Sequence, residues 1–80
     1  GKLKHYIPEN NVYVYFRYNE KESVMVVINN NPEKQKINTN RLSESLNGYQ
    51  SGTDVVTNKK WNINEDLEIE GKSVFVFELN

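Results

Sequence analysis

The 80-residue chain has no cysteine, one histidine, and no apolar run near the roughly 20 residues that a membrane helix needs. Without cysteine no disulfide can support the fold, and cysteine usage leaves the compartment open. One histidine gives little material for nucleophilic dyads or multi-histidine metal sites. No signal peptide is visible and no membrane insertion is expected, although a piece of a longer secreted or periplasmic protein would look the same.

Neither positive nor negative charge is in large excess. Ten Lys and Arg residues stand against eleven Asp and Glu residues, which gives a net charge of −1 with both signs interspersed. This pattern gives no electrostatic case for nucleic acid or an anionic membrane as a partner. There is no glycine-rich phosphate loop, so no cofactor is expected.

The chain is short, and residues 1–80 are expected to form one domain. A chain of this size buries only about 60% of its unfolded surface. Apolar residues make up only 36% of the sequence. The core must therefore rely on five Tyr, three Phe, one Trp and the aliphatic residues, and we expect its stability to be marginal.

Two β-rich segments, residues 12–18 and 23–28, flank the polar residues 19–22 and predict an antiparallel hairpin. If Tyr18 faces Ser23, the same register fixes the other cross-strand pairs. These pairs are Phe16 with Met25 and Val14 with Val27 on one face, and Tyr15 with Val26 and Tyr13 with Ile28 on the other.

Both faces of this hairpin are apolar, whereas a half-solvated strand alternates apolar and polar residues. One interpretation is a central strand pair covered on both sides within this domain. The other is a face built to lie against a neighbouring domain, as exposed apolar patches often are. We favour Tyr13, Tyr15, Val26 and Ile28 for that face, because tyrosine suits a partly wet interface.

Asn29 to Asn31 and Pro32 end the second strand of the hairpin. Asparagine tolerates left-handed backbone and proline cannot pair in a central ladder, so this stretch predicts a turn. A polar loop that binds sugar hydroxyls is the alternative. Residues 35–37 are then expected to return as a short strand.

The remaining chain predicts one short helix and further strands. Leu42 and Leu46 share a helical face within residues 39–48, with Thr39 or Asn40 as the cap and Gly48 at the end. Strands are expected at 53–57, near 61–63, at 67–69 and at 73–79, with a turn at 70–72. Seven or so short strands with frequent turn signals predict an all-β fold, either an antiparallel β-sandwich or a barrel.

No catalytic or metal-binding residues are predicted. Asn62, Asn64 and Asp66 have the spacing of the first ligands of an EF-hand loop, but Leu67 stands where that loop requires glycine. The acidic run of Glu65, Asp66, Glu68 and Glu70 would need a closed cleft to hydrolyse glycosides, so a solvated strand edge is the simpler interpretation. His5 has no fixed partner in the sequence and is expected to be a surface or strand residue.

The segments "GKLKHYIPENNVYVYFRY" and "SVMVVINNN" resemble the C-terminal domain of cyclomaltodextrinases, neopullulanases and related α-amylase-family glycosidases. The matching positions are Gly1, Leu3, Pro8, residues 12–17 and residues 24–29. "GTDVVTNK" is similar to the family's Asp-x-x-Thr segment, and "LEIEGKSVFVFEL" to its closing pair of strands. The resemblance spans nearly the whole chain in the right order.

The resemblance implies an all-β fold, an antiparallel Greek-key β-sandwich of about seven to eight short strands, packed beside a catalytic (β/α)-barrel in the same chain. The family's catalytic carboxylates lie in that barrel, so none is transferred to this chain and the domain by itself is not expected to be an enzyme. The expected function is a non-catalytic accessory domain of an α-glucan hydrolase that packs on the barrel and stabilises it.

Two alternatives from other classes remain. A carbohydrate-binding module would stack α-glucan on exposed aromatics, with Trp61 and Tyr49 as the first candidates, and Tyr6, Tyr13 and Tyr15 as further ones. Against this, Trp61 would simply pack in the core or at its rim. The third class is a free-standing adhesion or protein-interaction domain.

Overall fold

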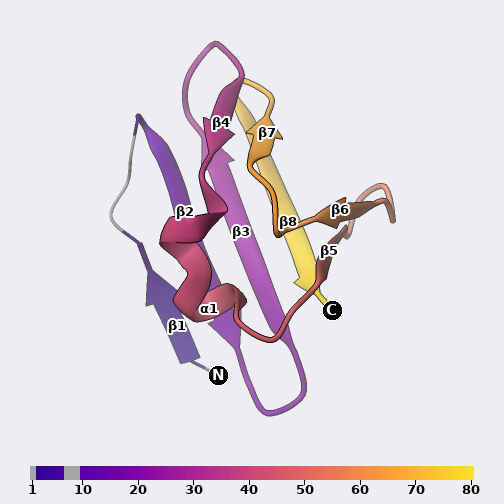
Figure 1. Ribbon diagram of the computed structural model, residues 1–80. Coiled ribbons are helices and arrows are strands. Elements are labelled where there is room, and N and C mark those ends of the chain that lie inside the picture. Colours follow the sequence, from indigo (N-terminus) through magenta and orange to yellow (C-terminus); the bar gives the residue numbers. More distant parts are fainter. Residues whose placement is uncertain (1, 7–9) are drawn as a thin grey trace.

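A six-stranded antiparallel sheet forms the larger of two layers in the computed structural model of the protein, which describes residues 2–6 and 10–80 (Figure 1). Gly1 and Pro8, two positions of the resemblance, lie outside the described residues. The strands of this sheet, in spatial order, are β1 (Lys2–His5), β2 (Val12–Tyr18), β3 (Ser23–Asn29), β8 (Ser73–Leu79), β5 (Ser51–Asp54) and β6 (Lys60–Asn62).

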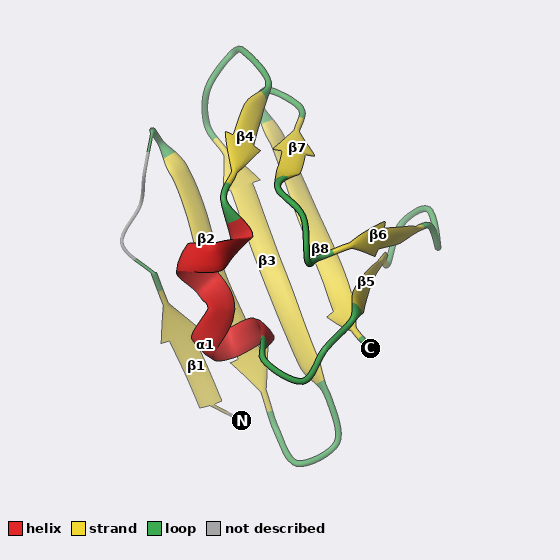
Figure 2. Ribbon diagram, viewed as in Figure 1, coloured by secondary structure: helices red, strands yellow, loops and turns green. Residues whose placement is uncertain are grey.

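The second layer is smaller and mixed. Strands β4 (Gln35–Ile37) and β7 (Leu67–Ile69) pair with each other, and a short 3₁₀ helix, η1 (Thr39–Leu42), leads into helix α1 (Ser43–Leu46). Figure 2 shows these elements lying over one face of β2, β3 and β8. The chain thus leaves β3 for the second layer and returns to the side of β3 as β8. The predicted all-β sandwich of seven to eight strands is confirmed.

The register predicted for the central hairpin is confirmed at every pair. Tyr18 faces Ser23, Phe16 faces Met25 and Tyr13 faces Ile28. Strand β8 continues the same rows on the far side of β3, with Phe77 opposite Met25. The alternation of side chains in these three strands therefore defines two faces.

The inner face, which points to the second layer, carries the core. Phe16, Met25 and Phe77 form a fully buried row across β2, β3 and β8. The second layer closes this row with buried apolar side chains that follow a period of two in the strands and three to four in the helices. These are Ile37, Leu42, Leu46, Leu67 and Ile69, and Ile63 from the turn between β6 and β7 joins the same core.

Three details differ from the sequence prediction. Residues 2–5 form strand β1, which was not predicted, and Asn38 rather than Thr39 or Asn40 caps the helical segment, accepting a 2.9 Å hydrogen bond from the Asn40 backbone N–H. Gly48 does follow the helix, with φ of +91°.

The third difference concerns the strand predicted at 53–57. Strand β5 begins earlier, at Ser51, and ends at Asp54, so that Val55 and Val56 lie in a turn. The Asp54 side chain causes this end, because its Oδ1 accepts a 2.9 Å bond from the Val56 N–H and a 3.4 Å bond from the Thr57 N–H. Such a local side-chain bond turns the backbone away from the sheet ladder.

Candidate functional site

The face of the six-stranded sheet that points away from the second layer is apolar over β2, β3 and β8, and we call it the outer face. Two rows cross it. The first row joins Tyr13, Ile28 and Val74, and the second joins Tyr15, Val26 and Val76. Val24 adds a further apolar side chain between Arg17 and Glu78.

No helix or strand among the described residues covers the outer face. Tyr13 remains 44% exposed and Val74 remains 62% exposed, at the two ends of the same row. Val26, at the centre, is buried yet stands outside the core cluster, so its neighbours on the sheet cover it. The interpretation in which both faces are covered within this domain is therefore wrong for the described residues, and an uncovered apolar face is what the structure presents.

Strand β1 widens the outer face beyond β2. The His5 ring lies 5.4 Å from the Tyr15 ring, centroid to centroid, and Leu3 is 54% exposed beside Arg17. Arg17, Glu78 and Lys60 lie on the next row, separated by Val24 and Thr53. The outer face is thus an apolar surface bordered on one side by charges of alternating sign.

Trp61, the first candidate for glycan contact, packs against the core from the inner side of β6. Its ring centroid lies 5.5 Å from that of Phe75 and 5.2 Å from that of Phe77. The Nε1–H of Trp61 is buried, with no hydrogen-bond partner among the described residues, so a sugar on the surface cannot use it as a donor. Rim packing accounts for this placement.

The tyrosines proposed for glycan contact divide into two groups. Tyr49 is part-buried and its hydroxyl donates a 2.8 Å bond to Ser23 Oγ, while the hydroxyls of Tyr6 and Ser45 lie 2.8 Å apart. Tyr13 and Tyr15 lie on the outer face instead. Glycan contact by Trp61 and Tyr49 stays a prediction, which a titration of tryptophan fluorescence with maltooligosaccharides would test.

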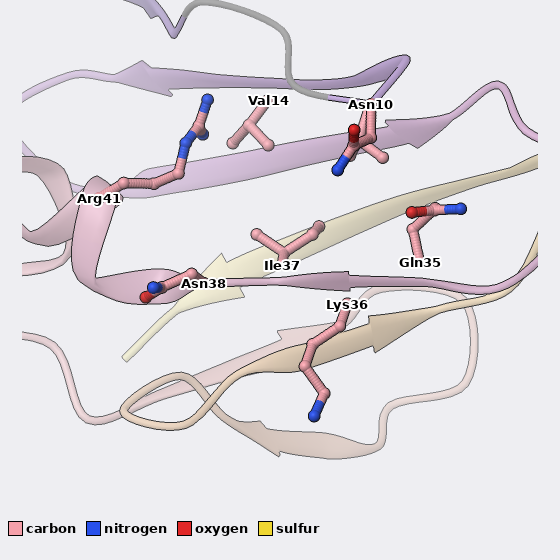
Figure 3. Close-up of a pocket in the computed structure, with 8 residues that line it drawn as sticks. Asn10, Val14, Gln35, Lys36, Ile37, Asn38 and Arg41 are labelled. Atoms are coloured by element: carbon pink, nitrogen blue, oxygen red, sulfur yellow. The ribbon is translucent and has the colours of Figure 1, made fainter.

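A small hollow opens between β2 and β4 (Figure 3). Its volume is about 30 Å³, whereas pockets for small molecules measure about 300–1,000 Å³. Val14 and Ile37 are among its apolar lining residues, and Asn10, Gln35 and Arg41 are among its polar ones. The hollow has room for about one water molecule and is too small for a sugar ring.

The asparagines of the 29–31 turn are used within the fold. The side-chain amide of buried Asn29 donates to three backbone carbonyls of other segments, those of Glu33, Ile69 and Glu70, at 3.0–3.1 Å. Its Oδ1 accepts from the backbone and side-chain amides of Asn31, both at 3.0 Å. Asn29 therefore ties β3 to the second layer, as turn chemistry and layer packing require.

Charged side chains form surface pairs rather than a reaction centre. Lys34 Nζ lies 3.4 Å from Glu70 and 3.9 Å from Glu68, and all three are exposed. Lys4 and Glu44 form a 2.9 Å pair, and the hydrogen bond to Glu44 raises the pKa of Lys4. In the described parts of the chain, no three His, Cys, Asp or Glu residues gather as metal ligands would.

Sequence reasoning identified the part of the outer face that lies on the strands but missed the turn after β5. Val55 and Val56 are 48% and 83% exposed in that turn. The signal was present as a Val-Val pair directly after Asp54, because that residue favours turns. None of the helices in the described residues is long and apolar enough to cross a membrane.

The sequence of the chain also matches a known protein family. The family model described as the cyclo-malto-dextrinase C-terminal domain matches residues 3–78, which is nearly all of the chain. The match spans the whole second layer and every strand of the sheet, except the first residue of β1 and the last residue of β8. The chain belongs to the family of cyclo-maltodextrinase C-terminal domains.

Proposed function

We propose that this domain is a non-catalytic accessory part of a cyclomaltodextrinase-like α-glucan hydrolase. It packs on the catalytic barrel of the same chain through the outer face and stabilises the barrel. The observation that carries the proposal is the uncovered apolar row in which Tyr13 is 44% and Val74 62% exposed. Family membership supports the choice of partner, because a C-terminal domain of such an enzyme follows a catalytic domain.

The physical argument rests on the distribution of apolar surface. In a domain of 80 residues the core is small, so apolar side chains that stay outside it lower the stability that the domain could reach. Yet Tyr13, Ile28 and Val74 form a continuous row on the outer face instead of joining the core. Interfaces between domains of one chain bury about 600–1,500 Å², and a sheet face of four strands is a surface of suitable shape for that.

A charge placed in the outer face of the full-length enzyme tests this proposal. In Val74→Asp the aspartate replaces an exposed side chain, so the unfolding free energy of the isolated domain should change by less than about 0.5 kcal/mol. In a docked enzyme the carboxylate is buried without a partner, which costs on the order of 3 kcal/mol. We expect a lower thermal midpoint for the full-length protein and faster proteolysis between the two domains.

Asn40→Asp is the matched control, because it adds the same charge at an exposed position of η1, over the opposite face of the sheet. We expect this variant to behave like the parent protein. If Val74→Asp also leaves the midpoint and the proteolysis rate unchanged, the outer face is not the docking surface. A gene without a barrel-coding region upstream would instead favour a free-standing interaction domain.

A further inference from the structure

The turn between β5 and β6, residues 55–59, exposes apolar side chains on a rigid frame. Val56 is 83% exposed and Val55 is 48% exposed. Turns normally carry Gly, Pro, Asn, Asp and Ser, so two consecutive valines at the tip of one are unexpected. A mismatch of this kind between local sequence preference and structure is typical of functional positions.

Buried Asp54 holds the frame of this turn. Besides the two bonds that its Oδ1 accepts, its backbone N–H donates to the Lys59 carbonyl at 2.9 Å, and its carbonyl accepts from the Asn58 N–H at 2.7 Å. Thr57 Oγ1 accepts a further 3.2 Å bond from the Lys59 N–H. These hydrogen bonds constrain the backbone that carries the valines, and a constrained turn loses less entropy when a partner binds it.

The turn continues the outer face. Asp54 pairs with Phe77 of β8, and the next residue, Val55, donates a 3.1 Å backbone bond to the Val76 carbonyl. Val55 thus extends the row of Tyr15, Val26 and Val76, and Val74 lies two residues from Val76 on the same face. Single exposed apolar residues need no explanation, but a continuous group of this kind marks an interface.

The charged residues from 55 to 64 are all positive, and exposed Glu78 faces Thr53 from the neighbouring strand β8. Lys59 and Lys60 are exposed at its end, the Asp54 carboxylate is buried, and no Asp or Glu occurs from residue 55 to residue 64. An apolar tip beside two lysines fits a recess with an apolar floor and an acidic rim, since complementary charges at a rim orient a partner.

We propose that the 55–59 turn is an anchor of the domain interface: Val56 inserts into an apolar recess with an acidic rim on the catalytic domain of the same chain. This inference rests on the proposed function and adds to it the segment that fixes how the domain is oriented. The outer face supplies a broad contact, and the turn supplies a protruding side chain that fits at one position only.

Thiol labelling in the full-length enzyme tests the anchor. The domain has no cysteine, so Val56→Cys, Val74→Cys and Glu20→Cys each introduce one thiol into it, and mass spectrometry of the peptide that contains it reports its reaction with maleimide. Glu20 lies exposed in the β2–β3 turn and is the control. The rate in the native protein is divided by the rate in urea-unfolded protein, which corrects for local reactivity.

We expect Val56→Cys and Val74→Cys to react at least about tenfold more slowly in the native protein, because a covered thiol reacts only when the contact opens. Glu20→Cys should react at nearly the unfolded rate. A protected Val74→Cys with a freely reacting Val56→Cys overturns the anchor and leaves the docking face intact. If both thiols react freely, the anchor and the docking face are both wrong. If only Val56→Cys is protected, the turn does not form one continuous contact with the outer face, and the anchor as proposed is wrong.

Two further arms identify the occupant of the contact. Labelling at protein concentrations a hundredfold apart should give the same protection, whereas protection lost on dilution assigns the contact to a second copy and overturns the proposal. Adding Lys59→Glu to Val56→Cys should increase the labelling rate, since it sets a negative charge against an acidic rim. Lys21→Glu, an exposed lysine at the far turn, is the matched control, and an equal effect of both substitutions overturns the acidic rim.

Discussion

Asn29 connects the two layers of the sandwich through a single buried side chain. Its amide nitrogen faces three backbone carbonyl oxygens, and its oxygen accepts from two amide groups of Asn31. A carbonyl oxygen buried without a donor costs about 1–3 kcal/mol. This residue therefore matters more to the fold than its position in an asparagine-rich turn suggests.

Asn29→Asp replaces the donor with a carboxylate that faces the same three carbonyls. We expect the unfolding free energy to fall by at least about 3 kcal/mol at neutral pH, because a buried charge without a partner is strongly destabilising. The carbonyls raise the pKa of the new carboxyl above the roughly 3.9 of the unfolded chain. The loss should therefore be small below about pH 4 and grow as the pH rises toward neutral.

Urea unfolding of Asn29→Asp at several pH values measures this, with Asn30→Asp as the control. Asn30 is exposed, and its side-chain oxygen accepts from Lys72, so a carboxylate is tolerated there. A loss for Asn29→Asp that does not vary with pH would contradict the proposed role of the three carbonyls.

Phe16 is the second residue on which the fold depends. It is 1% exposed, faces Met25 across the strand pair and meets the Tyr6 ring edge-on with a centroid separation of 5.6 Å. Phe16→Ala should cost about 3–5 kcal/mol, because it removes a large side chain and leaves a cavity. Tyr13→Ala, on the outer face, should cost much less by the same urea measurement, and equal losses would mean that the two faces are equally packed.

At the scale of elements, two turns meet closely at one end of the molecule. A Cβ added to Gly71 would lie 2.3 Å from the Pro32 carbonyl oxygen and 2.9 Å from that of Asn31. The backbone N–H of Lys72 also donates to the Asn31 carbonyl at 2.7 Å. Glycine at position 71 is therefore required by space, since any side chain would push the 29–32 turn away from β7 and β8.

Gly71→Ala is expected to destabilise the domain by about 1–3 kcal/mol, the usual cost of overpacking a tight contact. Glu70→Ala, at the exposed neighbouring position, should have little effect. Thermal or urea unfolding distinguishes the two, and a Gly71→Ala variant as stable as Glu70→Ala would show that the two turns separate easily.

Sequence patterns predicted the elements whose identity is local. The hairpin register followed from counting outward from a four-residue loop, and β8 followed from its run of valines and phenylalanines. Strand β1 was missed because Leu3 is its only strongly apolar residue and its pairing with β2 is a tertiary contact. Its two lysines suit an edge strand, which they protect from pairing with other chains.

The site was predictable only in part, for a related reason. Two apolar faces in one hairpin indicated a partner, but which face the second layer covers depends on how β4, β7 and the helices fold over it. The strand predicted at 53–57 extended past the observed end of β5 at Asp54. Val55 and Val56 have high strand preference, but the side chain of Asp54 forms its bonds with the following turn. Side-chain bonds of this kind are not visible in a hydrophobic pattern.

At the scale of the whole molecule, the non-catalytic role that we propose predicts that the domain alone does not hydrolyse glucans. The hollow between β2 and β4 measures about 30 Å³, and the acidic run of 65–70 lies on the exposed surface. We expect the purified domain to release no reducing sugar from starch or cyclodextrin. Release above the level of a mock purification would contradict the non-catalytic role.

The central claim is that the outer face is covered by the catalytic domain in the complete enzyme. The most direct measurement is an experimental structure of the full-length protein, from which the exposed fractions of Tyr13 and Val74 are obtained. We predict that both side chains, 44% and 62% exposed in the domain alone, become buried against the barrel. A structure in which they stay as exposed as they are here, with the barrel in contact with another surface, would contradict the claim.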